Sequence, residues 1–322
     1  MTAGYLARKV GTLVVTLFAV LTFNFLLFHV LPGDPVRLLA RSGHLDPLEA
    51  AQLRSLFGLD HSLPVQFLIY LKDVVHGNLG YSFAYRAPVT SVVGPALRNT
   101  ILLLGVATVV TVAVGILVGV VAGARAHTKV DSSTVTVSLA LWSLPTFWTG
   151  MILLILGGVW LGVLPVSGIA TAGYEFTTWG KIEDTAQHLV LPALTLVLVN
   201  VAEFVLITRS SLVEVMSEDY MVTARAKGLR RRVIVWRHGV RNALLPVTTA
   251  TALYIGMVLG GAIEVETVFS WPGMGLLTYN SVLQRDYPVL EASFLIFTIG
   301  VIVTNFIADL LYHLLDPRVR QA

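Results

Sequence analysis

The chain has 322 residues, of which 55% are hydrophobic and 13% are charged, with a formal net charge of +3. A soluble domain carries roughly 25% charged residues, so much of this chain's surface must face something other than water. The sequence contains no cysteine, which excludes disulfide scaffolds, thiolate metal sites and cysteine nucleophiles.

The first apolar segment follows two basic residues and covers Val10–Leu31, which is 22 residues without a charge. A cleaved signal peptide has an apolar core of about 7–15 residues and a small-residue cleavage site. Because this segment is longer and lacks such a site, we expect an uncleaved membrane span with its N-terminus inside. Its polar members, Asn24 and His29, are expected to face the fold or the membrane interface rather than to bind a ligand.

Residues 32–98 follow this span and are too polar to cross a membrane. Their basic and acidic residues are balanced in number, and the stretches 47–56 and 65–75 are predicted to be short helices. We therefore expect a loop domain here. Two of its stretches stand out in the printed sequence, namely Pro32-Gly33-Asp34-Pro35 and Gly77-Asn78-Leu79-Gly80-Tyr81-Ser82.

Five further apolar segments follow, at residues 100–124, 135–161, 189–208, 243–263 and 289–310. The segment 135–161 is interrupted by Ser143-Leu144-Pro145, and a membrane helix tolerates proline where neighbours satisfy the freed carbonyl. This kink either lies beside a pathway or is a structural bend. Together with the first span, the segments predict an all-α polytopic membrane protein of about six transmembrane helices.

Basic residues are distributed unevenly between the segments that join these spans. If both termini lie inside, the inner segments hold fourteen of the 22 lysines and arginines, although the outer segments are much longer. Basic residues concentrate in cytoplasmic loops, so this asymmetry predicts residues 32–98 outside, residues 209–242 inside and both termini in the cytoplasm. The fourteen are Arg8, Lys9, Arg125, Lys129, Arg209, Arg225, Lys227, Arg230, Arg231, Arg232, Arg237, Arg241, Arg318 and Arg320.

The most polar inner stretch covers residues 209–246, and its first part carries the signals of a short capped helix. Ser217 is a preferred N-cap residue, and two acidic residues follow it in the first turn. Two basic residues stand in the last turn, and Gly228 occupies the place of a C′ glycine. These signals predict a helix over residues 218–227.

The second part of the same stretch is amphipathic. Leu229, Val233, Trp236 and Val240 fall on one face of a predicted helix, and three arginines fall on another. We expect this helix to lie along a membrane surface with its basic face toward water or lipid headgroups.

The capped helix has two interpretations. Ala224, Ala226 and Gly228 are small and would let another surface approach closely, which suits docking into a groove of a partner. The alternative is a solvated cytoplasmic loop whose charges only fix the topology.

Three acidic residues lie within the predicted spans, namely Glu203, Glu291 and Asp309. An acidic residue inside a membrane indicates a functional site by default. Glu291 and Asp309 are near the ends of a span, where they can reach water, whereas Glu203 is expected to face an internal cavity. We name Glu203, Pro145 and Asn200 as candidate residues that line a pathway.

The sequence contains no nucleotide-cradling or catalytic motif of the types Gly-x-x-x-x-Gly-Lys-[Ser/Thr], His-Glu-x-x-His or Gly-x-Ser-x-Gly. We therefore expect neither an enzyme nor a chain that binds nucleotide through a P-loop, and no cofactor. The basic run at residues 230–232 is flanked by membrane segments, which argues against a nucleic-acid partner.

A family resemblance rests on Asp219-Tyr220, on Thr223-Ala224-Arg225-Ala226-Lys227-Gly228 and on Arg241-Asn242-Ala243-Leu244-Leu245-Pro246. These runs resemble the coupling loop of permease subunits in bacterial ABC importers, most of all the dipeptide/oligopeptide (peptide/nickel) type. The stretches 32–35, 77–82 and 264–275 resemble further segments of the same family. The general importer motif opens Glu-Ala-Ala where this chain has Val222-Thr223-Ala224, but the peptide-transporter variant is similar to this chain.

In that family the loop places a short helix in a cleft of a cytoplasmic ATPase. The resemblance therefore implies a set of ATPase-coupling residues in this chain. They are Glu218, Asp219, Tyr220, Thr223, Ala224, Arg225, Ala226, Lys227 and Gly228.

The resemblance also implies the type I ABC importer fold, arranged as a first span with an external loop domain (1–98), a five-span transmembrane domain (99–315) and a short cytoplasmic tail (316–322). Expected partners are a second homologous permease, two cytoplasmic ATP-binding subunits, an external substrate-binding protein and the lipid bilayer of the bacterial inner membrane. Di- or oligopeptides are the expected cargo. The alternatives are nickel or another small solute, or an ion-driven secondary transporter, although we find no internal repeat of the kind typical of secondary transporters.

Overall fold

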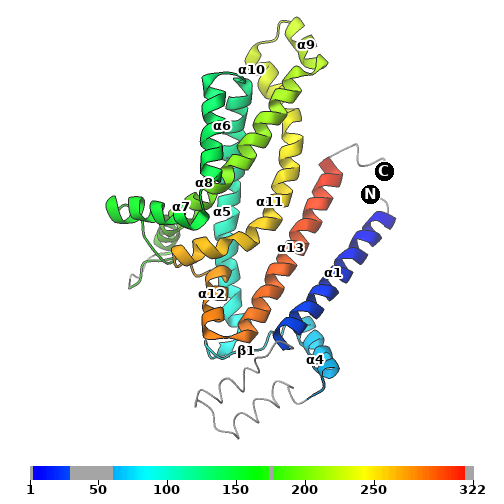
Figure 1. Cartoon of the computed structure of the whole chain (residues 1–322), viewed down its shortest axis with the longest axis vertical. Coiled ribbons are helices and arrows are strands. Elements are labelled where there is room, and N and C mark those ends of the chain that lie inside the picture. Colours follow the sequence, from blue (N-terminus) through cyan, green and yellow to red (C-terminus); the bar gives the residue numbers. More distant parts are fainter. Residues whose placement is uncertain (1–2, 30–60, 174–176, 316–322) are drawn as a thin grey trace. The chain divides into compact units, whose positions relative to one another are not determined.

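The computed structural model describes residues 3–29, 61–173 and 177–315, and these residues are mostly helical (Figure 1). A short antiparallel hairpin pairs Tyr81 with Pro88 and Ser82 with Ala87. The predicted helix at 65–75 is confirmed as α4, whereas the predicted helix at 47–56 lies outside the described residues. The elements are α1 (Ala3–His29), α4 (Leu63–Val75), β1 (Tyr81–Ser82), β2 (Ala87–Pro88), α5 (Val89–Ala124), α6 (Lys129–Trp142), α7 (Thr146–Leu153), η1 (Leu154–Trp160), α8 (Thr178–Ser217), α9 (Asp219–Ala226), α10 (Arg231–Val233), η2 (Ile234–Val240), α11 (Arg241–Val268), α12 (Met274–Gln284) and α13 (Tyr287–Leu315).

Four helices in the described part of the chain are long and apolar enough to cross a membrane. They cover Ala7–Phe28, Val89–Ala124, Thr178–Ser217 and Tyr287–Ile307, and each coincides with a predicted span. The predicted span at 243–263 falls on α11, a continuous helix that is not among those four. The chain is thus an all-α polytopic membrane protein, with up to five candidate spans in its described residues when the bent pair α6–α7 counts as one.

The remaining predicted span, at 135–161, is not a straight helix. It is divided into α6 and the α7–η1 segment, which meet at an angle of 100°. Pro145 has an extended backbone conformation, with φ −60° and ψ 136°, and precedes the first residue of α7. Proline lacks a donor and disfavours the helical conformation of the residue before it, so the helix ends at this point.

The chain divides into two compact units, which we describe separately. The first comprises residues 1–99 and 273–302, and the second comprises residues 100–272 and 303–322. In the first unit, the Asn24 side chain donates to the Tyr70 hydroxyl (3.2 Å) and to the Glu291 carbonyl (3.1 Å). Burial raises the pKa of Tyr70 to about 12. Asn24 therefore makes contacts within the fold, as expected.

A buried carboxylate fixes the hairpin in the first unit. The Asp286 side chain lies in the turn between α12 and α13 and is 1% exposed. Its Oδ2 accepts hydrogen bonds from the Ser82 hydroxyl (2.5 Å) and from the Ala84 backbone N–H (3.2 Å). The Ser82 oxygen in turn accepts from the Tyr85 N–H (3.0 Å). One carboxyl group thus organises the β1–β2 connection.

The second unit contains the larger apolar core. Its buried side chains come from α5, α8, α11 and the loop after α11, with Leu103, Leu191 and Trp271 among them. Glu266 is also fully buried there, and its Oε1 accepts from the Thr100 hydroxyl at 2.6 Å, whereas Glu264 is exposed.

Helices α5 and α8 approach each other closely because α5 presents glycines at the contact. A β-carbon added at Gly115 would lie 2.3 Å from Phe204 Cβ, and one added at Gly119 would lie 2.6 Å from Thr208 Cβ. At Gly123 the nearest atoms, from Arg209 and Leu212, would be 3.1 Å away. Small residues at every fourth position let two membrane helices pack backbone to backbone.

Candidate functional site

Helix α8 leads directly into the polar stretch that the sequence singles out. It ends at Ser217, and the next residue, Glu218, has an extended backbone with φ −66° and ψ 149° before α9 begins at Asp219. The predicted N-cap at Ser217 is therefore wrong, because Ser217 is still helical and its hydroxyl donates to the Glu214 carbonyl at 2.6 Å. A single extended residue thus joins two helices.

The predicted end of the short helix is confirmed. Lys227 follows the last residue of α9, and Gly228 has a left-handed backbone with φ +73°. The Gly228 N–H donates to the Arg225 carbonyl at 2.9 Å, which closes the last turn. A β-carbon at Gly228 would meet nothing within 4 Å, so glycine is favoured here by backbone conformation and not by lack of space.

Two side chains attach α9 to the rest of its unit. Met221 is fully buried and Ala224 nearly so, and both pack with Ile234 of η2. Of the nine residues predicted to couple to an ATPase, Ala224 thus faces inward and the other eight are exposed. Ala224 serves the attachment of the helix, and the exposed eight form the face that a partner can reach.

Polar contacts add to this attachment at both ends of α9. Arg225 donates from Nη2 to the Met216 carbonyl of α8 at 2.7 Å. The Asn242 side chain, at the start of α11, donates to the Tyr220 hydroxyl at 3.0 Å. Sequence reasoning missed the contributions of Met221 and Asn242, although the three-residue spacing of Met221 and Ala224 is that of one helical face.

The stretch after α9 differs from the predicted amphipathic helix. It consists of the three-residue α10 and of η2, a π-helix over Ile234–Val240. Of the four apolar residues assigned to one face, Val240 is buried within the chain and Leu229, Val233 and Trp236 are exposed, whereas Ile234 and Val235 are buried. A π-helix takes more residues per turn than an α-helix, so Trp236 and Val240, which would share one face of an α-helix, differ in burial within η2.

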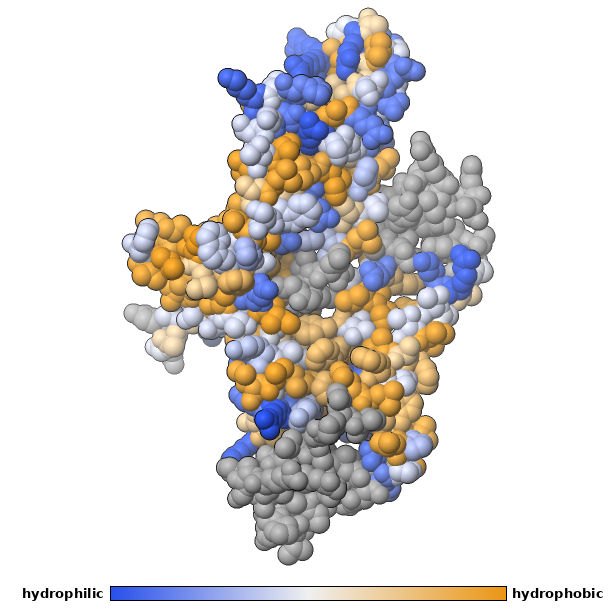
Figure 2. Space-filling model, viewed as in Figure 1, coloured by the Kyte–Doolittle hydropathy of each residue, from blue (hydrophilic) through white to orange (hydrophobic). Residues whose placement is uncertain are grey.

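The exposed surface around α9 combines charge with apolar side chains. Hydrophilic residues gather around α9 and α10, with some hydrophobic residues between them (Figure 2). The exposed hydrophobic residues of this stretch are Tyr220, Val222, Leu229, Val233 and Trp236. Acidic residues precede or begin α9 and basic residues follow at its end, which matches the helix dipole. Such a surface suits a protein partner.

The three candidate pathway residues occupy different surroundings. Glu203 and Asn200 are half-buried on α8, where the Asn200 side chain donates to its own helix at the Leu196 carbonyl (2.7 Å). Pro145 is exposed at the bend between α6 and α7. Among the described residues no hydrogen bond or ion pair joins these three, so their role in a pathway stays a prediction. Of the other intramembrane acids, Glu291 is half-buried, and the side chain of Asp309 lies outside the described residues.

Comparison with known proteins identifies the class of protein to which this chain belongs. Residues 115–321 match the family model of the binding-protein-dependent transport system inner membrane component, and residues 2–104 match the model of its N-terminal part. The chain therefore belongs to this family of transport permeases.

Curated relatives match along nearly their whole length. The dipeptide transport system permease protein DppB of Escherichia coli (strain K12) is 37% identical over 333 residues, covering 98% of each chain. The di/tripeptide transport system permease protein DppB of Pseudomonas aeruginosa (strain UCBPP-PA14) is 38% identical over 330 residues, again 98% of each. The oligopeptide transport system permease protein AppB of Bacillus subtilis (strain 168) is 36% identical over 318 residues, covering 98% of this chain and 99% of its own.

Proposed function

We propose that this chain is the transmembrane permease subunit of an ATP-driven importer for di- and oligopeptides. The observation that carries the proposal is its similarity, over 98% of its length, to three permeases that are named for dipeptide, di/tripeptide and oligopeptide transport. The all-α membrane architecture and the short exposed helix after α8 agree with this role.

The chain would form one half of a translocation pathway, and a second homologous permease would form the other half. Two cytoplasmic ATP-binding subunits would supply the energy, and an external substrate-binding protein would deliver the peptide. In the bacterial inner membrane, residues 32–98 would lie outside, whereas residues 209–242 and both termini would lie in the cytoplasm. The excess of basic residues in the proposed inner segments supports this orientation.

Coupling would occur through the exposed face of α9. Glu218, Asp219, Tyr220 and the outward residues up to Gly228 would enter the cleft of an ATP-binding subunit, while Met221 and Ala224 hold the helix to η2. Glu203, Asn200 and Pro145 are proposed to line the pathway that this coupling opens. Half-burial of Glu203 within an apolar span supports the choice of that residue.

The proposal is tested by reconstituting the permease with its partner subunits in liposomes. Uptake of a labelled dipeptide should require ATP and the binding protein, and it should persist in the presence of a protonophore. Uptake that a protonophore abolishes while ATP removal has no effect would instead establish an ion-driven transporter. Uptake of nickel without competition by peptides would replace the peptide assignment within the same family.

A further inference from the structure

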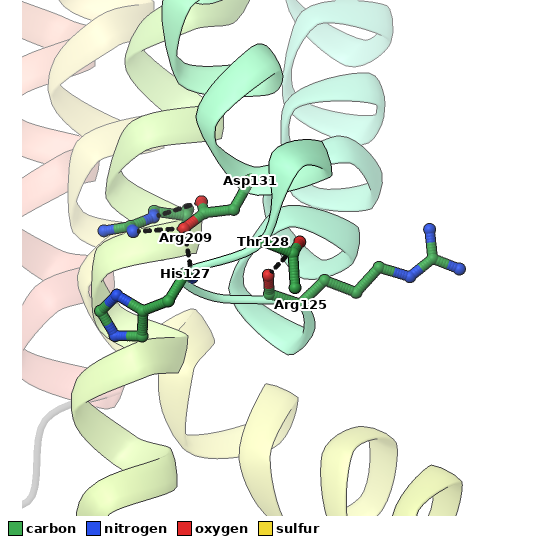
Figure 3. A network of polar contacts seen from close by, with 5 residues as sticks. All are labelled: Arg125, His127, Thr128, Asp131 and Arg209. Carbon is green, nitrogen blue, oxygen red and sulfur yellow. Dashed lines mark hydrogen bonds and ion pairs between the residues drawn. The ribbon is translucent and has the colours of Figure 1, made fainter.

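The turn between α5 and α6 is organised by one buried carboxylate. Asp131, in the first turn of α6, is 4% exposed and accepts two hydrogen bonds from Arg209 of α8, from Nε at 2.9 Å and from Nη2 at 2.7 Å (Figure 3). Its Oδ2 also accepts from the His127 backbone N–H at 2.9 Å. The Thr128 hydroxyl donates to the Arg125 carbonyl at 2.6 Å within the same turn. The carboxylate therefore has a charged partner in Arg209 and a further hydrogen-bond donor in the His127 backbone.

This arrangement is specific in its geometry. An arginine that meets a carboxylate through two parallel hydrogen bonds fixes both the distance and the relative orientation of the two side chains. His127 has a left-handed backbone with φ +64°, a conformation that a β-carbon disfavours, and its N–H is held by Asp131. The carboxylate therefore stabilises this conformation of the turn.

Helix α6 packs along α8, and this ion pair is a polar link within that contact. The buried residues of α6, Asp131 and Ser138, are both polar. By contrast, α5 and α8 are already held together by the close contacts at Gly115, Gly119 and Gly123. The Asp131–Arg209 pair is therefore a specific link of α6 to α8, but α5 and α8 can stay packed without it.

The pair also lies close to the base of the coupling helix. Arg209 stands eight residues before Ser217, the last residue of α8, after which Glu218 leads into α9. On the other side of α9, Arg231 of α10 donates from Nη2 to the Ala124 carbonyl at the end of α5 (2.5 Å). The segments that enter and leave α9 thus both contact the region around the α5–α6 turn.

We propose that Asp131 and Arg209 are positioning residues for energy coupling. Their ion pair makes α6, and with it the bent α6–α7 segment, follow α8 when an ATP-binding subunit displaces α9. This inference rests on the proposed function of α9 as a coupling helix. It adds a link that the family resemblance does not supply, since neither residue belongs to the predicted coupling set.

The test uses the full complex reconstituted in liposomes and compares Asp131→Asn, Arg209→Gln and the double variant. We expect each to hydrolyse ATP and to retain its ATP-binding subunits, but to transport at least tenfold less peptide per ATP than the wild type. The double variant should transport as much peptide per ATP as the single variant with the lower ratio, because both substitutions remove the same interaction.

The matched control is Asp184→Asn, at the opposite end of the same helix α8. Asp184 is also a buried carboxylate, which accepts from the Thr171 N–H (2.8 Å) and hydroxyl (2.6 Å). Its loss should affect stability in a comparable way while the peptide transported per ATP stays at the wild-type value. An equal fall in this ratio for Asp184→Asn would assign Asp131 a general structural role and overturn the proposal.

A covalent replacement keeps the test decisive if the single variants insert poorly. Because the chain lacks cysteine, cysteines placed at positions 131 and 209 can be joined by a short bifunctional methanethiosulfonate reagent. Joining them should restore the peptide transported per ATP, and a reductant that cleaves the cross-link should lower this ratio again. No restoration, or a wild-type ratio in the singly substituted proteins, would overturn the proposal. The proposed importer function would fail separately, because the wild type itself would then show no ATP-dependent uptake.

Discussion

At the scale of single residues, Gly228 shows a position that the sequence predicts well. The glycine stands one residue after Lys227, has φ +73°, and has free space around its α-carbon. Its identity is therefore set by backbone conformation. A side chain here would also extend into the surface that a docked partner occupies in the proposed function.

We predict that Gly228→Leu lowers coupling without preventing membrane insertion. The left-handed backbone penalises a β-carbon by roughly 1–2 kcal/mol, and the change lies in a short helix that the membrane spans do not depend on. The variant should reach the membrane at the wild-type level but bind less ATP-binding subunit on co-purification and lose substrate-stimulated hydrolysis.

The matched control is Gly173→Leu, which has φ +80° and nothing within 4 Å of an added β-carbon, but lies before α8. Both variants carry the same type of backbone strain, so only Gly228→Leu should lose the ATP-binding subunit. Normal association and uptake in Gly228→Leu would leave the stretch as a charged inner loop.

A second residue-scale prediction concerns Ser82, which is fully buried and bridges Asp286 and the Tyr85 N–H. Ser82→Ala should destabilise the protein by roughly 1–3 kcal/mol, because it leaves buried polar groups without a partner. Ser91→Ala removes an exposed hydroxyl that donates to the Pro88 carbonyl, and it should change stability by less than about 0.5 kcal/mol. Thermal unfolding in detergent compares the two, and equal melting temperatures would contradict the role of Ser82.

At the scale of elements, local signals located the helices but not all of their contacts. The short helix predicted at 218–227 is found at Asp219–Ala226, and its end is marked locally by Gly228. The N-cap at Ser217 was misplaced because α8 continues to that residue, which depends on tertiary packing. The π-helix η2 was missed because a π-helix has no recognised signal in a single sequence.

The element-scale prediction tests the contact between α5 and α8. Gly119→Leu should prevent α5 from packing on α8, because a β-carbon there would lie 2.6 Å from Thr208 Cβ and 2.7 Å from the Val205 carbonyl oxygen. Gly105→Leu, on the same helix, meets nothing within 4 Å and serves as the control. We expect Gly119→Leu to be degraded or to aggregate in detergent while Gly105→Leu elutes as a single species. Monodisperse Gly119→Leu of normal yield would show that the helices are not this close.

At the scale of the whole molecule, composition alone indicated the class. The low charge content and the series of apolar segments predicted a polytopic membrane protein. In the described part of the chain, four predicted spans are apolar helices of sufficient length, and the bent pair α6–α7 can count as a fifth. What composition could not supply is the 100° bend between α6 and α7, because Pro145 predicts an interruption and not its angle.

The whole-molecule prediction is the orientation in the membrane. Single cysteines introduced at Ser62, before α4, and at Ser217, at the end of α8, occupy exposed positions in an otherwise cysteine-free chain. An impermeant thiol reagent applied to intact cells should label position 62 and not position 217, whereas both should react after the membrane is opened. The reverse pattern in intact cells would invert the proposed topology.

The glycine contact between α5 and α8 has a mechanical consequence. Two helices whose backbones touch cannot rotate about their own axes without collision, since any turn brings the side chains next to the glycines into the contact. We therefore expect α5 and α8 to move as one body, and we expect a gate in this unit to open where longer side chains separate the helices.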